Sequence, residues 1–256
     1  MAILEWDKDN QRLFETGVDH VVLYLMNDNG VYEAGEAWNG VTGVTESPEG
    51  ADANDIYADN IKYLSLISKE DWKGTIKAYT FPISFNKCMG NIYNDAFKAF
   101  FGQQKRTKFG ISWRSLWGND TVGDAFAYKL HLAWGLSAAP SEADHATQND
   151  SPEAQEFSWE VSSIPPKTNR KIYMGGAKQT ANEKSIQACA HIWIGSHTMH
   201  EYTPTGGSLT FGQPNPLMSI FEQKLYGTPA SGSTAAVDAT LPTLDSVVKY
   251  LTTGAW

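Results

Sequence analysis

The chain has 256 residues, of which 29 are acidic and 20 are basic, and its formal net charge at pH 7 is −9. This balance argues against static binding of nucleic acid, because phosphate backbones are held by clustered lysine and arginine. No stretch approaches the roughly 18 consecutive apolar residues of a membrane-spanning helix. The N-terminal sequence MAILEWDKDNQ lacks the basic and apolar regions of a signal peptide.

The first third of the chain is predicted to be mostly β, since apolar and polar residues alternate with a period of two. The predicted strands span residues 18–25, 36–44, 61–67 and 75–81. Between the second and third lies ESPEGADANDIYADN, residues 46–60, with five carboxylates and no lysine or arginine. We expect this acidic stretch to be a long polar loop. Its carboxylates belong to Glu46, Glu49, Asp52, Asp55 and Asp59.

The clearest strand pattern is AFAYKLHLAWGL, residues 125–136. Its large apolar residues are predicted to share one face, and the residues between them form a second face that is small or polar. The second face holds Ala125, Ala127, Lys129, His131, Ala133 and Gly135. Residues 109–117 alternate in the same way, and GNDTVGD between the two runs has the composition of a turn. The two runs therefore predict a hairpin.

Two more strands, 155–163 and 184–194, are predicted later in the chain, and helical signals are few. Asn215 and Pro216 begin a short amphipathic pattern that predicts a helix ending before Gly227. A second helix is predicted to open at Thr240-Leu241-Pro242, and a further one is considered within residues 86–101.

These elements predict a mainly β fold, a sandwich or barrel with one to three short flanking helices. Residues 228–240 are rich in small side chains, which is typical of a flexible linker. We therefore divide the chain into a β domain of residues 1–227, a linker of residues 228–240 and a C-terminal helical extension of residues 241–256.

Motifs of catalysis are missing from the sequence, which contains no GxSxG elbow, no HExxH pair and no P-loop. Serine, histidine and aspartate are scattered, as in any chain of this size. We predict a protein without enzymatic activity and without a cofactor.

The run CAHIWIGSHTMH holds the sharpest metal candidate, formed by Cys189, His191, His197 and His200. Zinc accepts such ligands, but their spacing fits no common zinc module. A cysteine beside an aromatic residue on a strand is more often a small core residue. In the acidic stretch, DANDIY lacks the glycine of a calcium-binding loop. We therefore predict no metal site.

The cysteines, Cys88 and Cys189, are expected to be free thiols, because two distant cysteines form no disulfide framework.

Nine tryptophans leave a lectin-like, carbohydrate- or surface-binding module as an alternative, since sugars stack on exposed indoles. Trp38, in AWNG, is the best candidate for an exposed indole. Core packing is expected for the tryptophans on the apolar faces of predicted strands: Trp113, Trp134 and Trp159.

Five blocks of the sequence, in order, carry a resemblance to a known family. They are ETGVDHVVLYL, AWNGVTGVTESPEGADANDIYADNIKYLSL, GQQKRTKFGISWRSLWGNDT, YKLHLAWG and NDSPEAQEFSWEVSS. Together they resemble the major tail tube protein of long, non-contractile (siphovirus-type) phage tails, as found in phages and prophages of Gram-positive bacteria. The resemblance covers about residues 6–163 and returns at LMSIFEQKLYG and LPTLDSVVKYL, whereas residues 167–208 depart from it.

This resemblance implies a structural protein of the virion whose subunits close into six-membered rings that stack into a hollow tube for DNA ejection. The implied partners are further copies of the chain, with the tape-measure, tail-tip initiator and tail terminator proteins, and phage DNA in transit only. It implies assembly in the cytoplasm of the host bacterium, no membrane insertion and no enzymatic activity. The small or polar face of residues 125–136 becomes a candidate for the lumen wall or a subunit seam, and we expect a net negative lumen.

In the related tubes a long loop between strands reaches from one subunit to its neighbours. The resemblance therefore makes the acidic stretch a predicted contact between subunits. Its predicted counterparts are the members of the one dense basic cluster, Lys105, Arg106 and Lys108.

Overall fold

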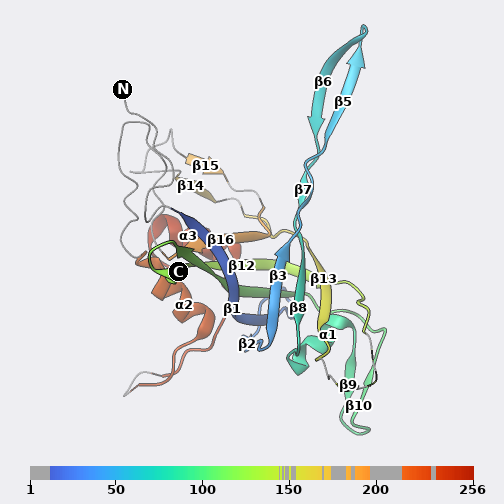
Figure 1. The fold of residues 1–256 in the computed structure, drawn as a ribbon, viewed down its shortest axis with the longest axis vertical. Helices are drawn as coiled ribbons and strands as arrows, with labels where there is room; N and C mark the ends of the chain where they lie inside the picture. Colours follow the sequence, from blue (N-terminus) through green and yellow to red (C-terminus); the bar gives the residue numbers. More distant parts are fainter. Residues whose placement is uncertain are drawn as a thin grey trace.

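The structure is a computed structural model that describes residues 12–143, 145, 147, 150, 154–168, 170–173, 183–185, 188–196, 215–231 and 235–256. Within them the chain is mainly β, with one large antiparallel sheet, small two-stranded sheets and three short α-helices (Figure 1). The predicted fold class is confirmed at this level. None of the described helices is long and apolar enough to cross a membrane.

The large sheet has the strand order β2-β1-β11-β12-β13-β8-β3, and β16 also pairs with β12. Its members are β1 (Leu13–Leu25), β2 (Glu36–Ala37), β3 (Val41–Glu46), β8 (Lys73–Ala78), β11 (Phe109–Asn119), β12 (Gly123–Ala138), β13 (Phe157–Ser163) and β16 (His191–Gly195). Only residues 38–40 separate β2 from β3, so the two ends of the strand order lie together and the sheet wraps round. The backbone N–H of Trp38, directly after β2, donates to the carbonyl of Val21 in β1 at 2.8 Å.

The remaining elements are β4 (Glu49–Gly50), β5 (Ala53–Ala58), β6 (Ile61–Ile67), β7 (Glu70–Asp71), a 3-10 turn (Ile83–Phe85), α1 (Asn86–Met89), β9 (Ile92–Asn94), β10 (Ala99–Phe101), β14 (Lys171–Tyr173), β15 (Glu183–Ser185), α2 (Leu217–Tyr226) and α3 (Leu244–Thr253). Among them, β4 pairs with β7, β5 with β6, β9 with β10 and β14 with β15.

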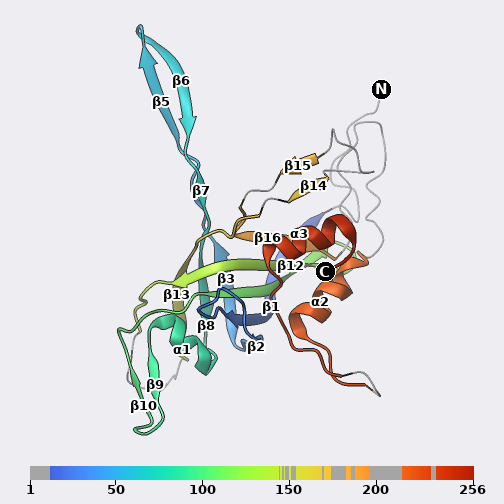
Figure 2. The same ribbon diagram turned by 180° about the vertical axis from the view of Figure 1, so that it is seen from behind.

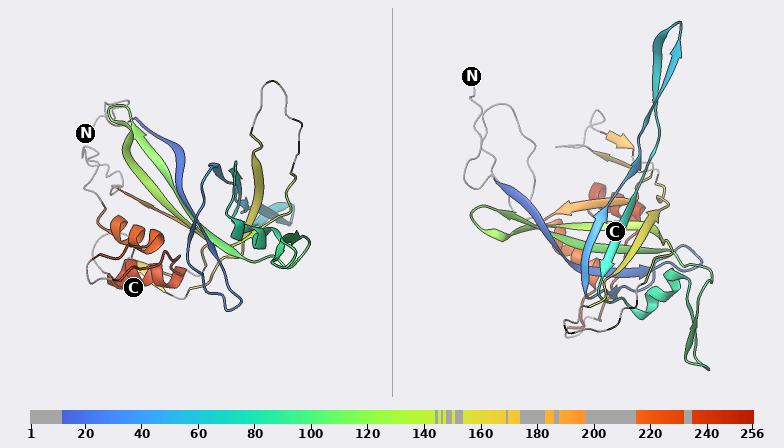
Figure 3. Two further views of the ribbon diagram at one scale, coloured as in Figure 1. Left: turned by 90° about the horizontal axis from the view of Figure 1, so that it is seen from below. Right: turned by 45° about the vertical axis from the view of Figure 1, so that its right-hand side comes forward.

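The strands enclose one hydrophobic core, and a second core lies between the outer face of the sheet and the helices α2 and α3 (Figure 3, left). Alternation along β1 supplies both cores: Val21 and Leu23 enter the first, and Val22 and Tyr24 enter the second. The Tyr24 hydroxyl donates to the Leu225 carbonyl at 2.7 Å, which ties β1 to the end of α2.

Local sequence signals explain where the two longer helices begin. The Asn215 side chain accepts from the Leu217 N–H at 3.0 Å, and Thr243 accepts from the Ser246 N–H at 3.2 Å, so both helix starts have side-chain partners. The helical segment predicted as an extension packs on the sheet, since Val247 and Val248 of α3 are buried in the second core. Thr228 and Val237, within the predicted linker, form an antiparallel bridge.

Most predicted elements are present, but two predicted strands and one predicted helix differ. The run 36–44 is interrupted by a turn around Gly40, whose φ is +75°. Residues 184–194 contain parts of two strands, β15 and β16. Residues 86–101 form only the one-turn helix α1, which ends at Gly90, and then the β9–β10 hairpin.

The small or polar face of β12 is interior, and the hypothesis that it lines a lumen or a subunit seam is therefore wrong for its central part. His131 is 6% exposed and Ala133 is fully buried. The reason is that helices cover one face of β12 while the wrapped sheet covers the other. In the middle of β12, the large apolar side chains and the small or polar side chains are therefore both buried within a single subunit.

Candidate functional site

The acidic stretch is one side of a β-hairpin that projects from the body of the protein (Figures 1 and 2). Beyond the main-sheet pair β3–β8, the ribbon continues through β4–β7 and β5–β6. We call residues 49–71 the arm. The expectation of a loop was wrong, because residues 61–71 provide a complete antiparallel partner for the acidic residues.

The arm turns at its tip through two residues with left-handed backbone, Asp59 (φ 52°) and Asn60 (φ 63°). Two such residues in a two-residue connection make a type I′ turn, whose twist matches that of paired strands. Asparagine and aspartate tolerate this conformation better than other residues with a side chain. The sequence ADNI therefore dictates the tip locally.

Both faces of the outer arm carry exposed apolar side chains. Cross-strand pairing places Ile56 opposite Leu64 on one face, with Leu66 beside them. Tyr57 and Ile67 lie on the other face, with exposures of 68% and 73%. A two-stranded ribbon is marginally stable alone in water, and an exposed apolar patch usually marks an interaction surface. The arm therefore has the character of a contact element.

The arm's carboxylates partly find partners within the ribbon itself. Asp55 pairs with Lys62 at 2.7 Å and accepts from the Ser65 hydroxyl at 2.6 Å. Hydrogen bonds from these two residues lower the pKa of Asp55. Glu49 pairs with Lys73, the first residue of β8, at 2.5 Å. The lack of bases inside residues 46–60 is thus offset by bases on the opposite strand.

The predicted basic counterparts lie in the segment between β10 and β11. Lys105 pairs with Asp28 at 3.3 Å, and the Arg106 guanidinium donates to the Ala138 carbonyl. The Lys108 carbonyl accepts from the Met26 N–H at 2.9 Å. The neighbouring β9–β10 hairpin points away from the arm (Figures 1 and 2), so the proposed pairing requires a second copy of the chain and stays a prediction.

Glu46, another of the predicted contact residues, lies at the root of the arm in a cluster with two histidines. The cluster joins the end of β3 to β12 and β16. Nδ1 of His131 is 3.0 Å from Nε2 of His191. The Glu46 carboxylate lies 3.6 Å from Nδ1 of His131 and 3.1 Å from Nδ1 of His191. Among the described residues, this is the group of histidine, cysteine and acidic side chains whose ligand atoms converge, all within 4.8 Å.

Aromatic rings hold the two imidazoles in nearly one plane. Trp113 stacks on His131 at 4.8 Å and on His191 at 5.3 Å, with interplanar angles of 8° and 10°. The Trp72 indole N–H donates to Glu46 at 3.3 Å. This packing fixes the direction in which each ring nitrogen points.

A second layer of hydrogen bonds supports His131 from its other side. Its Nε2 lies 2.9 Å from the Ser115 hydroxyl, which donates to Glu15 at 2.6 Å. Lys129 in turn pairs with Glu15. Burial alone would raise the pKa of Glu15, but hydrogen bonds from Lys129 and Ser115 bring it below its ordinary value. Glu15 is therefore an ionised acceptor at neutral pH.

Burial also sets the protonation of the cluster. It lowers the pKa of His131 to about 4 and that of His191 to about 3, and it raises the pKa of Glu46. Both imidazoles are consequently neutral at pH 7 and each offers a lone pair. Two imidazoles and a carboxylate are ligands of zinc-type ions.

Sequence reasoning identified His191 but grouped it with other partners. Of the predicted set, His197 and His200 lie outside the described residues, and the Cys189 thiol donates to the His191 carbonyl at 2.9 Å. Glu46, His131 and His191 share no short spacing that a sequence motif would reveal. The available signal was a histidine on the interior face of a strand, at residue 131.

Trp38, the candidate for an exposed sugar-stacking indole, is only 3% exposed, and its N–H donates to the Thr80 carbonyl at 2.8 Å. That prediction was wrong, because residues 38–40 turn the ring into the first core. The strand tryptophans expected in the core are buried: Trp113, Trp134 and Trp159. Both cysteines are free thiols, as predicted.

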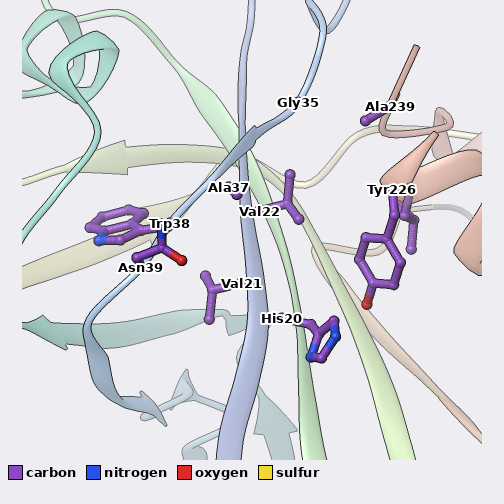
Figure 4. Close-up of a pocket in the computed structure, with 10 residues that line it drawn as sticks. His20, Val21, Val22, Gly35, Ala37, Trp38, Asn39, Tyr226 and Ala239 are labelled. Atoms are coloured by element: carbon purple, nitrogen blue, oxygen red, sulfur yellow. The ribbon is translucent and has the colours of Figure 1, made fainter. Parts of the chain in front are cut away.

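A pocket lies between β1, the segment after β2 and the end of α2 (Figure 4). In Figure 4 His20 and Tyr226 lie beside each other at one side of the pocket, and Trp38 lies at the other. The His20 and Tyr226 ring centroids are 5.8 Å apart. Its other walls are mainly Val21, Val22 and Trp38. The pocket brings few polar side chains together and does not support a catalytic assignment.

Comparison of the sequence with protein-family models and with curated proteins gave no match.

Proposed function

We propose that the chain is a structural virion protein that assembles into stacked hexameric rings forming the tube of a non-contractile phage tail, the conduit for DNA ejection. The observation that carries the proposal is the arm, a long ribbon with apolar side chains exposed on both faces. Such a surface loses solvent-exposed apolar area when it lies on another subunit, and this favours association.

Several features support the same reading. The mainly β body has two cores that fix a rigid base for the arm. The acidic chain, with a net charge of −9, suits a conduit in which DNA moves without adhering. In this proposal the tape-measure, tip and terminator proteins are further partners, and the arm contacts neighbouring copies of the chain.

The direct test is negative-stain microscopy of the purified protein at high concentration, with sedimentation to measure mass. We expect six-fold rings or tubes. Replacing two apolar residues of one arm face, Leu64→Asn with Leu66→Asn, should leave the monomer folded and reduce assembly. Val122→Asn is the matched control, since Val122 is a comparably exposed apolar residue (56%) at the β11–β12 turn.

Persistent monomers at every concentration tested, with or without a nucleating tail tip, would contradict the proposal. Glycan binding by those monomers would favour the lectin-like alternative. Trp38, the best candidate for a sugar-stacking indole in that alternative, is buried.

A further inference from the structure

The hydrogen-bond directions at the root of the arm can be worked out from the ends of the cluster inward. The Ser115 hydroxyl has one proton, and it is donated to the ionised Glu15. The 2.9 Å contact between Ser115 and Nε2 of His131 therefore needs an imidazole N–H as donor. A neutral imidazole carries one N–H, so Nδ1 of His131 holds a lone pair.

The same counting applies from the other end. The Glu46 carboxylate lies 3.1 Å from Nδ1 of His191. In the tautomer that carries the His191 proton on this nitrogen, Nε2 of His191 holds a lone pair. The two lone-pair nitrogens then face each other at 3.0 Å. Two acceptors at this distance repel each other unless a cation lies between or beside them. The cluster is therefore electron-rich at one point.

The spacing of the donor atoms suits a metal ion. Zinc held at about 2.0–2.1 Å in tetrahedral geometry places neighbouring ligand atoms about 3.3 Å apart. The observed separations of 3.0 Å between the two nitrogens and 3.6 Å between Nδ1 of His131 and the Glu46 carboxylate lie on either side of that value. Shifts of a few tenths of an ångström bring these two separations to it, and the ligand atoms of all three residues lie within 4.8 Å of one another.

We propose that Glu46, His131 and His191 bind a divalent transition-metal ion of the zinc type at the root of the arm. The three ligands come from β3, β12 and β16, and water fills the fourth position from the exposed side of Glu46. Ser115 and Glu15 orient His131 as a carboxylate-linked support of the kind that metal-bound histidines have. The ion would fix the root of the arm to two strands of the body.

The test uses the full chain, stripped with a chelator and titrated with ZnCl2 by calorimetry and with CoCl2 by visible absorption. We expect saturable binding of one ion, tetrahedral cobalt bands, and a thermal midpoint that rises with zinc concentration. His131→Gln and Glu46→Gln should each weaken binding by more than the roughly 10- to 100-fold expected for loss of a supporting residue. His145→Gln, at an exposed position, is the matched control.

A further variant protects the test against misfolding. Ser115→Ala keeps all three ligands and should weaken zinc binding by about 10- to 100-fold. A second set, Cys189→Ser with His197→Gln and His200→Gln, removes the alternative ligands that the sequence offers beside His191 and should leave binding unchanged. Saturable binding that persists in Glu46→Gln and His131→Gln but is lost in this second set overturns the proposal. So does the absence of saturable zinc or cobalt binding to the wild-type chain, which would mean that the cluster shares only a proton.

This site and the assembly proposal fail separately. Zinc binding is measured on the monomer, whereas ring formation is measured by microscopy and sedimentation.

Discussion

The strands β12 and β6 were both predicted from period-two patterns but have opposite environments. Around its middle, β12 buries Leu130, Leu132 and Trp134 under the helices and His131 and Ala133 inside the wrapped sheet. Every residue of β6 is exposed, so the apolar side chains on both of its faces are in contact with solvent. Alternation therefore identifies a strand, but it does not say what covers each face.

The difference separates two kinds of apolar surface. In the body, aromatic rings pack on one another: the Trp38 and Phe85 rings lie 4.5 Å apart, and those of Phe85 and Trp159 lie 5.2 Å apart. On the arm, the large side chains have one ribbon partner and solvent. The body is stabilised by burial within one chain, whereas the arm keeps its apolar area for an intermolecular contact in the proposed tube.

The strongest test of this contrast compares Trp159→Ala in the body with Leu66→Ala on the arm. Trp159 is 1% exposed, and its loss should lower the free energy of unfolding by about 3–5 kcal/mol. Leu66 is 55% exposed, and its loss should change the free energy by no more than about 0.5 kcal/mol in the monomer. Urea unfolding followed by tryptophan fluorescence or circular dichroism measures both. Similar losses in the two variants would mean that the arm belongs to the cooperative core.

A backbone test probes how β12 serves two neighbours. Gly135 has φ +65°, at the point where the partner of β12 changes from β16 to β13, and a Cβ there would lie 2.4 Å from the Ile164 carbonyl oxygen. Gly135→Ala should cost at least about 1–2 kcal/mol from the left-handed conformation, with the clash added. Gly43→Ala on β3 is the control, because nothing lies within 4 Å of its added Cβ. Equal stability of the two variants would contradict this account of the strand junction.

Much of the fold was predictable because its signals are local. The hairpin of β11 and β12, the strand β6 and the start of α2 follow from alternation, turn composition and a capping asparagine. The acidic stretch was predicted to be a loop. Only its pairing with residues 61–71 shows that it forms strands. The interior position of His131 was missed for a similar reason: only the wrapped sheet shows that both faces of β12 are covered.

The candidate metal cluster was beyond sequence reasoning on physical grounds. Its three ligands come from different strands, and the pairing of β12 with β16 places His131 opposite Trp193, next to His191. Nothing in the spacing of these residues reports that pairing. Glu46 was singled out for its charge, and the structure places its carboxylate beside His131 and His191 at the root of the arm.

Alkaline pH should expose the difference between a buried and a solvated thiol. Burial raises the pKa of Cys88 from 9.0 to about 12. The unfolded chain loses this proton first, so the stabilisation is complete below pH 9 and is lost as pH rises from about 9 to about 12. The expected slope is at most about 1.4 kcal/mol per pH unit for this group. Unfolding of Cys88→Ala should show a shallower decline between pH 9 and 10.5, and an unchanged slope would contradict the assignment.

The arm's charges should affect assembly more than stability, because its carboxylates are exposed or paired within the ribbon. The triple variant Asp52→Asn, Asp55→Asn and Asp59→Asn removes one ion pair, Asp55 with Lys62, and solvent-exposed ion pairs contribute little to stability. We expect the monomer to stay folded by circular dichroism. In the proposed tube the carboxylates steer subunits toward basic residues of a neighbour, so assembly at low salt should be slower and less sensitive to ionic strength.

A charge-matched control makes this last prediction specific to the arm. Asp95→Asn, Asp120→Asn and Asp124→Asn change the net charge by the same amount, at positions in the β9–β10 connection, in the β11–β12 connection and at the start of β12. If steering depends on where the charge lies, light scattering should show slower assembly only for the arm variant. If both triple variants assemble alike, general repulsion between acidic chains sets the rate, and the arm acts through its apolar faces alone.

The basic cluster gives the reciprocal test: charge reversal at Lys105, combined with Asp59→Lys on the arm, should restore part of the salt dependence if the two meet across subunits.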